Sequence, residues 1–363
     1  FDDEVSRYCL YRNFYDPYQR EWKNGNSRWD ILDMLRLTRA LRPEGIEWTD
    51  HEPGRPSFKL EHLTAANGIA HEAAHDALSD VTATIAMAKL VKQKQPRLFD
   101  YVVNHRSKRS VTEMLDLNHR KPFFHISGML SSANMYGAIM MPLAMHPTNS
   151  NGIICVDLSA DPELLLGQNV DQIMRGVFTA GDQLSSEEQR IPLKVVHINK
   201  APVVTTHKLI DAAAAKRLNI NVEQCEAHWR KLNQVDLRDK LHAVFAERTF
   251  PKKTDAEQQL YEGFLPNSDR NLLDEVRNTT SEGFKKHQFH FSDERYNQLL
   301  FSYRARFFND SLSAQEQATW LESCRWRLHD EDAGYLTVKR LLAEVEQLLA
   351  AGDLPTEKVA VLD

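Results

Sequence analysis

The chain has 363 residues, 42% of them hydrophobic and 26% charged, with a formal net charge of −6. This length predicts two or three domains, and the composition is typical of a globular protein without a membrane-spanning run of apolar residues. The mildly acidic net charge does not by itself indicate nucleic-acid binding, but it allows a local basic groove.

The N-terminus reads FDDEVSRY, with neither a basic leader nor an apolar core, which excludes a signal peptide. It also lacks an initiator Met, so we expect a fragment of a longer protein. The four cysteines are scattered singly, without a CxxC pair. This spacing favours neither a disulfide framework nor a zinc site, and it fits a reducing cytoplasm.

The first predicted domain, residues 1–95, is helical. Residues 3–41 carry apolar residues three and four apart, as in WDILDMLRLTRAL, and a Pro- and Gly-rich loop follows from Pro43 to Pro56. SFKLEHLTAANGI predicts a short helix ended by Gly68, and AHDALSDVTATIAMAKL predicts another that closes near Gln95. No strand is evident, so the sheet of an α/β domain would lie mostly upstream. The face expected to pack on that sheet carries Ala83, Ile85, Ala86 and Ala88.

The pattern changes near residue 120. KPFFHISGM, AIMMPLAMHP, GIICVDLS and IPLKVVHINKAPVV are short apolar runs punctuated by Pro, Gly and Asn, which predicts strands. LLLGQNVDQIMRGVFTA predicts a helical insertion, and helical spacing returns over residues 207–249. We therefore assign residues 96–249 to a β-rich domain with helical insertions. Pro251 marks a hinge, and residues 252–363 form a helical domain.

Three polar residues stand at the start of the helix predicted in AHDALSDVTATIAMAKL. Asp76 and Asp80 are four apart and share a helix face, so they could chelate one cation. His75 and Asp80 are about 140° apart round a helix, so they converge only if His75 lies at the helix entrance. The alternative is that Asp76 caps the helix and Asp80 is solvated.

A second acidic cluster, Asp2, Asp3 and Glu4, lies at the beginning of the chain. Two acidic clusters and a histidine suit a two-metal phosphodiester hydrolase. The carboxylates would hold cations that neutralise the scissile phosphate, and the histidine would deprotonate the attacking water.

PSFKLEHLTAANGIAHEAAHDALSDVTATIAMAKL resembles the third motif of the DEDD-type 3′→5′ exonucleases, a His and an Asp with four residues between them. These are His75 and Asp80, and Phe1-Asp2 resembles the end of the second motif. RNFYDPY, NSRWDILD, ALRPEGIEW, KQPRLFDY, VHINK and FSYRAR extend the resemblance, in order, to the bacterial exonuclease I family over nearly the whole chain.

This resemblance implies an α/β fold with a ribonuclease H-like exonuclease domain, incomplete at its N-terminus, then an SH3-like β-rich domain and an α-helical C-terminal domain. It implies a cytoplasmic, monomeric 3′→5′ exodeoxyribonuclease that degrades single-stranded DNA to mononucleotides in DNA repair and recombination. Hydrolysis would use two Mg²⁺ ions, with Mn²⁺ as a substitute.

Carried over by position, Asp80 would be a direct metal ligand. Asp2 would support the metal site or reach the metal through water, and His75 would be the general base. Asp3 and Asp76 would be neighbours that do not bind the metal. The family's first motif, Asp-x-Glu on the first strand, is not found in this chain, so we expect these 363 residues to be inactive alone.

The resemblance also implies a binding surface of cations, aromatics and one amide, since single strands bind cations along the phosphates and aromatics under the bases. The expected DNA contacts are Arg7, Tyr18, Trp22, Arg36, Lys59, Arg106, Lys108, Lys194 and Asn199. The family more often has Arg where Lys59 stands, which keeps the charge but loses bidentate geometry. Trp29 is expected to be a core aromatic instead. Arg42 and Tyr101 match positions that dock the acidic C-terminal tail of single-stranded-DNA-binding protein.

Two other functions stay open at this point. His75-Asp76 is an HD dipeptide with His71 and His62 upstream, as in HD-type metal phosphohydrolases, although these need a further Asp and a wholly helical domain. A non-catalytic single-stranded-DNA-binding or scaffold protein is the second alternative.

Overall fold

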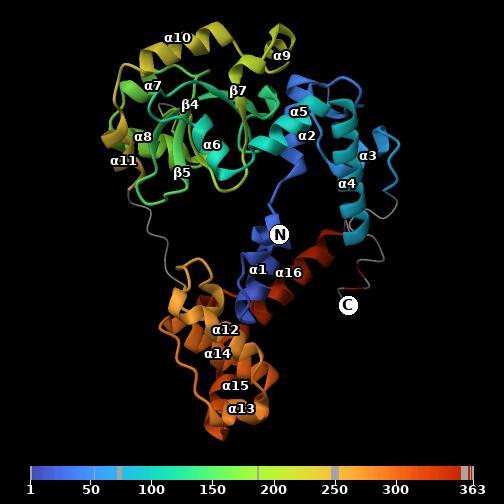
Figure 1. The fold of residues 1–363 in the computed structure, drawn as a ribbon, viewed down its shortest axis with the longest axis vertical. Coiled ribbons are helices and arrows are strands. Elements are labelled where there is room, and N and C mark those ends of the chain that lie inside the picture. The colour runs from blue at the N-terminus through green and yellow to red at the C-terminus, as the bar shows by residue number, and fades with distance from the viewer. Residues whose placement is uncertain are drawn as a thin grey trace. The chain divides into compact units, whose positions relative to one another are not determined.

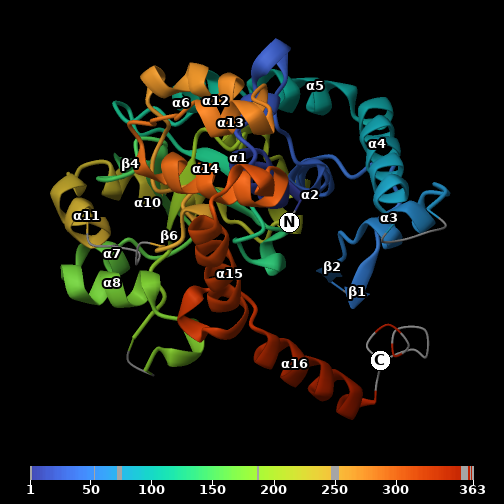
Figure 2. The same cartoon turned by 90° about the horizontal axis from the view of Figure 1, so that it is seen from below.

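The computed structural model describes residues 2–52, 54–71, 76–185, 188–246, 253–352, 359 and 361. The chain divides into two compact units, drawn in Figures 1 and 2. Ser27–Thr249 form one, here called the sheet unit, and Phe1–Asn26 with Phe250–Asp363 form the other, the helical unit. Within the described part of the chain, no helix is both long and apolar enough to cross a membrane.

The sheet unit begins with helices and one small hairpin. The helices are α2 (Ile31–Leu41), α3 (Leu60–Ala66), α4 (Ala77–Lys94), α5 (Pro96–His105) and α6 (Lys108–Met114). The antiparallel hairpin of β1 (Asp50–Glu52) and β2 (Arg55–Pro56) lies beside α3 in Figure 2. The prediction of a strandless loop here is wrong, because Gly54 adopts φ 81°, which permits a tight turn.

Helix α4 buries one narrow stripe within this chain. Its fully buried residues are Ala83, Met87 and Val91, four apart, which is the spacing of a single helix stripe. Ile85 lies off that stripe and is 50% exposed within this chain, so its place on a face that packs against an upstream sheet stays a prediction. The predicted end of the helix near Gln95 is confirmed, since Gln95 is the C-cap and Pro96 begins α5.

The five-stranded sheet confirms the predicted β-rich region. Its strands are β3 (Phe123–Ile126), β4 (Gly137–Met145), β5 (Gly152–Asp157), β6 (Leu193–His197) and β7 (Val203–Thr206). They pair antiparallel in the order β6-β5-β4-β3-β7. Every residue of β4 except Met145 is buried, which explains its unbroken apolar sequence. Pro142 is tolerated in this central strand because the register shifts there.

Alternate side chains along β4 belong to two different hydrophobic clusters of the sheet unit. Ile139 and Met141 contribute to the larger apolar cluster, which includes α2 and α4, whereas Ala138 and Met140 join a smaller cluster with Val111 of α6. The helices of this half are α7 (Glu163–Leu166), α8 (Val170–Phe178), α9 (Ala212–Arg217), α10 (Val222–Leu232) and α11 (Arg238–Phe245). Helices α8 and α11 lie side by side (Figure 1), so the predicted helical insertion is confirmed.

The helical unit contains α1 (Asp2–Arg12), α12 (Arg270–Arg277), α13 (Ser281–Lys286), α14 (Glu294–Phe307), α15 (Ala314–His329) and α16 (Val338–Ala351). Short 3-10 helices, from both units, are η1 (Gln19–Glu21), η2 (Lys23–Gly25), η3 (Ser132–Asn134), η4 (Gly181–Gln183), η5 (His207–Leu209), η6 (Ala256–Gln258), η7 (Asn267–Asp269), η8 (Asn309–Ser311) and η9 (Glu331–Ala333). The predicted hinge at Pro251 lies outside the described residues.

Aromatic packing holds α1 against the C-terminal helices. Tyr11 and Phe14 are fully buried, and both rings meet Tyr296 of α14, at 5.5 and 5.9 Å between centroids. The Tyr11 hydroxyl donates to the carbonyl of Ala256 at 2.9 Å. Residues 2–26 therefore pack with the C-terminal helices, whereas the sequence suggested that they belong with residues 27–95. The three predicted domain ranges remain a prediction.

The four cysteines are free thiols in different surroundings. Cys155 and Cys225 are buried, and burial raises the pKa of both thiols. Cys9, on α1, is exposed, and Cys324 is intermediate.

Candidate nucleic-acid and metal site

The start of α4 carries the polar residues for which the sequence predicts either metal binding or helix capping. Asp76 is the N-cap, and its carboxylate accepts a hydrogen bond from the backbone N–H of Ser79 at 3.0 Å. Asp80 lies one turn further on, in the first turn of the helix. His75 lies outside the described residues, and it precedes a helix that begins at Ala77.

Asp80 has a buried histidine as a neighbour. The His71 Nε2 atom lies 2.8 Å from Asp80 Oδ1, and the two side chains are 5% and 43% exposed. Asp80 is therefore accessible from solvent while one of its oxygens is engaged.

Asp2, the second predicted metal-site carboxylate, is exposed in the first turn of α1. Its neighbour Asp3 pairs with Arg20 at 2.8 Å. Asp2 belongs to the helical unit and Asp80 to the sheet unit. Within the described residues, no group of three or more His, Cys, Asp or Glu side chains could hold a metal ion. Asp80 suits Mg²⁺ or Mn²⁺ as a single hard oxygen ligand, and it does not make a complete site.

Arg36 of α2 is the centre of a half-buried cationic cluster in the sheet unit. It pairs with Asp33 at 2.6 Å, and its guanidinium lies 4.6 Å from the ring centre of Tyr136 and 5.9 Å from that of Phe58. Its Nε atom is buried and has no hydrogen-bond partner among the described residues. Such an unused donor is costly unless a ligand or water satisfies it.

Lys194 of β6 faces the same acid. Burial lowers the pKa of Lys194, and the charge of Asp33 opposes that shift. Burial raises the pKa of Asp33, against the hydrogen bond from Arg36. The fold thus brings Arg36 and Lys194 together around Asp33. Lys59, next to Phe58 in the chain, is 60% exposed and pairs weakly with Glu61 at 3.6 Å.

A second cationic cluster lies at the start of α6. The Lys108 ammonium donates to Asn151 Oδ1 at 2.7 Å, and the carbonyl of Asn151 accepts from the N–H of Ile198 at 2.9 Å. Asn199 follows Ile198 and is exposed, so Lys108 and Asn199 share one neighbourhood. Arg106 donates through Nε to the hydroxyl of Ser27 at 2.9 Å.

Arg7, in the helical unit, forms a close ion pair with Glu21. It donates to both carboxylate oxygens of Glu21, at 2.7 and 3.0 Å, and its guanidinium lies 5.4 Å from the ring centre of Tyr18. The hydrogen bond to Glu21 raises the pKa of Arg7. A phosphate near Arg7 would therefore compete with Glu21.

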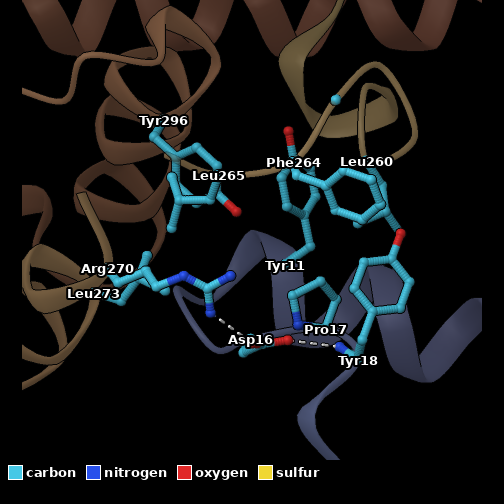
Figure 3. Close-up of a pocket in the computed structure, with 11 residues that line it drawn as sticks. Tyr11, Asp16, Pro17, Tyr18, Leu260, Phe264, Leu265, Arg270, Leu273 and Tyr296 are labelled. Carbon is cyan, nitrogen blue, oxygen red and sulfur yellow. Dashed lines mark hydrogen bonds and ion pairs between the residues drawn. The ribbon is translucent and has the colours of Figure 1, made fainter. Parts of the chain in front are cut away.

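The helical unit also carries exposed aromatic side chains. Trp22 is 58% exposed, and Phe264 is 85% exposed with its ring centre 6.4 Å from that of Tyr18. Figure 3 shows Tyr18 and Phe264 on one side of a cavity of about 50 Å³ that also borders Tyr11 and Tyr296. A cavity of this size holds a few water molecules at most, so a nucleobase could stack only on its rim. The sequence analysis did not single out Phe264, and the available signal was an aromatic between Gly263 and Pro266 in the loop YEGFLPNS.

Trp29 is confirmed as a core aromatic. It packs against the main apolar cluster and meets Phe99 edge-on at 5.4 Å.

Arg42 and Tyr101, the predicted partner site, both contact the segment around η5. Arg42 pairs with Asp211 at 3.2 Å and donates to the carbonyl of Leu209 at 3.4 Å. Tyr101 stacks on His105, with 4.2 Å between ring centres, and hydrogen-bonds the backbone of Thr206. An acidic peptide bound here would displace Asp211 from Arg42.

Comparison with protein families gives two matches that together span most of the chain. Residues 106–247 match the Exonuclease I SH3-like domain, and residues 254–363 match the Exonuclease I C-terminal domain. Exodeoxyribonuclease I of Haemophilus influenzae is 44% identical over 325 residues, which is 88% of this chain and 68% of that protein. The Escherichia coli enzyme is 45% identical over 327 residues, 90% of this chain and 69% of that protein.

Solved structures give the same result. E. coli exonuclease I in complex with a dA16 oligonucleotide superposes with a TM-score of 0.93 at 42% identity. The zinc-bound form of the E. coli ExoI–ssDNA complex gives 0.90 at 43%, and an ExoI/SSB-Ct complex gives 0.89 at 41%. Each match covers 100% of this chain and 76% of the other. The predicted SH3-like and helical C-terminal domains are confirmed.

Proposed function

This chain belongs to the exodeoxyribonuclease I family, and from that premise we propose that it is part of an enzyme that degrades single-stranded DNA from the 3′ end. The observation that carries the proposal is 44–45% identity over about nine tenths of the chain to two such enzymes. Mononucleotide products, a monomeric state and a cytoplasmic role in repair and recombination belong to the same proposal.

The proposed DNA surface uses one set of residues in each unit. In the sheet unit, Arg36 and Lys194 would bind phosphates beside the rings of Phe58 and Tyr136, and the unused Nε donor of Arg36 supports this role. Lys59, Arg106, Lys108 and Asn199 would extend the contact. In the helical unit, Arg7 would bind a phosphate. The aromatic side chains there would stack on bases, namely those of Tyr18, Trp22 and Phe264.

For catalysis we propose Asp80 as a metal ligand, Asp2 as a supporting carboxylate and His75 as the general base. Mg²⁺, or Mn²⁺ in its place, would supply charge neutralisation at the scissile phosphate. The described residues offer no complete metal cluster. We therefore propose that these 363 residues bind DNA but need a further acidic motif to hydrolyse it.

We also propose that Arg42 and Tyr101 bind the acidic tail of single-stranded-DNA-binding protein. The Arg42 guanidinium and the Tyr101 ring lie near the same η5 segment, and the ion pair of Arg42 with Asp211 supports a role for Arg42 in binding an acidic partner. Substituting Arg42 with Glu should abolish binding of a tail peptide in isothermal calorimetry.

Two observations disfavour the HD-type alternative. The Asp76 carboxylate caps helix α4. The chain also contains a five-stranded sheet, whereas an HD domain is wholly helical. In the full-length parent with Mg²⁺, Asp76→Asn should keep exonuclease activity and His75→Ala should lose it. The opposite result would favour the HD chemistry, and no degradation by the parent would favour a non-catalytic binding protein.

DNA binding by the 363-residue chain can be measured by fluorescence anisotropy with a labelled oligo-dT. Lys108→Ala should weaken binding and lower the slope of log K against log salt by about 0.7, the value of one phosphate contact on a single strand. Arg109→Ala is the matched control, since this neighbouring cation is 90% exposed and pairs only with Glu113 among the partners resolved for it. Equal effects of the two substitutions would contradict the proposed contact.

A further inference from the structure

The guanidinium of Arg36 uses only part of its hydrogen-bonding capacity. Its side chain is 15% exposed, and Nη1 donates to Asp33 Oδ1 at 2.6 Å. Nε and Nη2 have no hydrogen-bond partner among the described residues. These two nitrogens share the edge of the group that can donate two parallel hydrogen bonds to a phosphate. Such binding needs a fixed guanidinium, because an arginine side chain is otherwise free to adopt many rotamers.

Arg39, one turn further along α2, provides a contrast. It donates to the carbonyl of Thr49 at 2.7 Å and pairs with Asp50. Its guanidinium lies 5.7 Å from the ring centre of Phe58, and that of Arg36 lies 5.9 Å from the same ring. The hydrogen bonds of Arg39 are thus made within the chain, whereas Arg36 depends more on its neighbouring ring and backbone.

Tyr136 supplies the nearer aromatic ring, 4.6 Å from the Arg36 guanidinium. It ends the loop of residues 127–136 between β3 and β4, where Met135 and Tyr136 adopt φ 49° and 60°. Two successive non-glycine residues in the left-handed region are strained, and strain of this kind concentrates at ligand sites. The N–H of Tyr136 donates to the carbonyl of Ser131 at 2.9 Å, and its carbonyl accepts from the N–H of Ser127 at 3.0 Å. These bonds fix the backbone that carries the ring.

Gly128, in the same loop, also lies close to the guanidinium. A Cβ added to Gly128 would lie 3.0 Å from Nη1 and 3.2 Å from Nη2 of Arg36. The φ of Gly128 is outside the left-handed region, so the backbone there would accept alanine, and the space would not. The carboxylate of Asp33, the ring of Tyr136 and the backbone of Gly128 therefore all border the guanidinium.

We propose that Tyr136 is a positioning residue that holds the Arg36 guanidinium in the orientation that binds a DNA phosphate, and that Gly128 leaves the space this orientation needs. The inference rests on the proposed function, since it takes Arg36 to be a phosphate contact. Contact between a cation and an aromatic face changes an equilibrium by about 2- to 30-fold. The competing explanations are that Tyr136 only stabilises the loop, or that its ring itself stacks on a base.

Two substitutions of Tyr136 separate these explanations, because Tyr136→Phe keeps the ring and Tyr136→Leu removes it. The probe is a labelled oligo-dT, titrated with the 363-residue chain at several salt concentrations and followed by fluorescence anisotropy. The thermal midpoint of each variant without DNA reports the structural contribution separately.

We expect Tyr136→Leu to weaken oligo-dT binding by about 2- to 30-fold. It should also lower the slope of log K against log salt by up to about 0.7, the value of one phosphate contact on a single strand. Tyr136→Phe should keep both the affinity and the slope. A lowered thermal midpoint in Tyr136→Leu, with unchanged affinity and slope, would show a stabilising role only and overturn the proposal.

Arg36→Ala distinguishes a failure of this inference from a failure of the proposed function. If Arg36→Ala leaves binding unchanged, Arg36 is not a phosphate contact, and its positioning fails with it. If Arg36→Ala weakens binding and Tyr136→Leu does not, the positioning role alone fails. In the double variant, Tyr136→Leu should add nothing to the loss from Arg36→Ala. Additive losses would assign the ring to base stacking and refute positioning.

Gly128→Ala covers the case in which Tyr136→Leu does not fold. The added Cβ must displace the Arg36 guanidinium by a few tenths of an ångström, so affinity and salt slope should both fall with Tyr136 intact. Gly181→Ala is the control, since nothing lies within 4 Å of a Cβ there. Values in Gly128→Ala equal to those of the control would show that Arg36 needs no fixed orientation, against the proposal.

Discussion

Replacing Glu257 by glutamine is expected to loosen the helical unit and, with it, the attachment of α1. Glu257 is 5% exposed and lies among three guanidinium groups: Arg306 at 2.6 Å, Arg327 at 3.4 Å and Arg12 of α1 at 3.7 Å. The carbonyl of Glu257 also accepts from Arg12 Nε at 3.0 Å. A neutral amide of the same shape removes the anion and keeps the packing.

The magnitude follows from what each arginine retains. Removing one partner of a buried ion pair typically costs about 3 to 5 kcal/mol. Arg327 keeps its pair with Asp255 at 2.8 Å, and the side chains of Arg306 and Arg12 are 28% and 34% exposed, so water can solvate them. We therefore expect the lower end, about 3 kcal/mol, which for a unit of this size lowers the melting temperature by roughly 10 °C.

Differential scanning calorimetry measures this effect on the transition of the helical unit. Glu344→Gln is the control, because Glu344 pairs with Arg340 on the exposed surface of α16 and should cost less than about 0.5 kcal/mol. If the two substitutions lower the melting temperature equally, the buried network is not what holds α1 in place. Loss of the Arg12 contact would also disturb Arg7 and Asp2 on the same helix, so DNA affinity should fall in parallel.

Three further outcomes are expected. Gly176→Ala should destabilise the sheet unit by about 1 to 3 kcal/mol in urea unfolding, since a Cβ there would lie 2.5 Å from Ile191 Cγ1 and 2.6 Å from the carbonyl of Gln189. Gly181→Ala, with open space around it, should be neutral. Burial lowers the pKa of His125 to about 4, so the unfolded chain gains a proton first, and stability should fall by about 3 kcal/mol between pH 6.5 and pH 4. His125→Asn should flatten that dependence. Phe264→Ala should weaken oligo-dT binding by about 1 to 3 kcal/mol, whereas Phe307→Ala, another exposed aromatic of the helical unit, should leave it unchanged.

Local patterns were enough to predict most elements. The cap and end of α4 follow from Asp76 and Pro96, and the buried strand β4 follows from its continuous apolar run. The predicted family followed from several motifs in one order, and it is confirmed by the comparisons. These features depend on residues close together in the chain.

Other features depend on distant residues and could not be predicted in the same way. The charge of Asp33 acts on Lys194, which lies far away in the sequence, and no local pattern links the two residues. The hydrogen bond from His71 to Asp80 requires the turn after α3, which the sequence marks only with Gly68. Small apolar residues all round α4 also conceal which stripe is buried within this chain, and that stripe is Ala83, Met87 and Val91.

The different surroundings of the cysteines make the native sequence suitable for site-directed labelling. Cys155 and Cys225 are buried with raised thiol pKa values, and a thiol in that state reacts slowly. Cys9 is exposed on α1, two positions from Arg7 and about two helical turns from Asp2. A maleimide dye should therefore attach first at Cys9, where its fluorescence would report the arrival of a DNA end without any engineered residue.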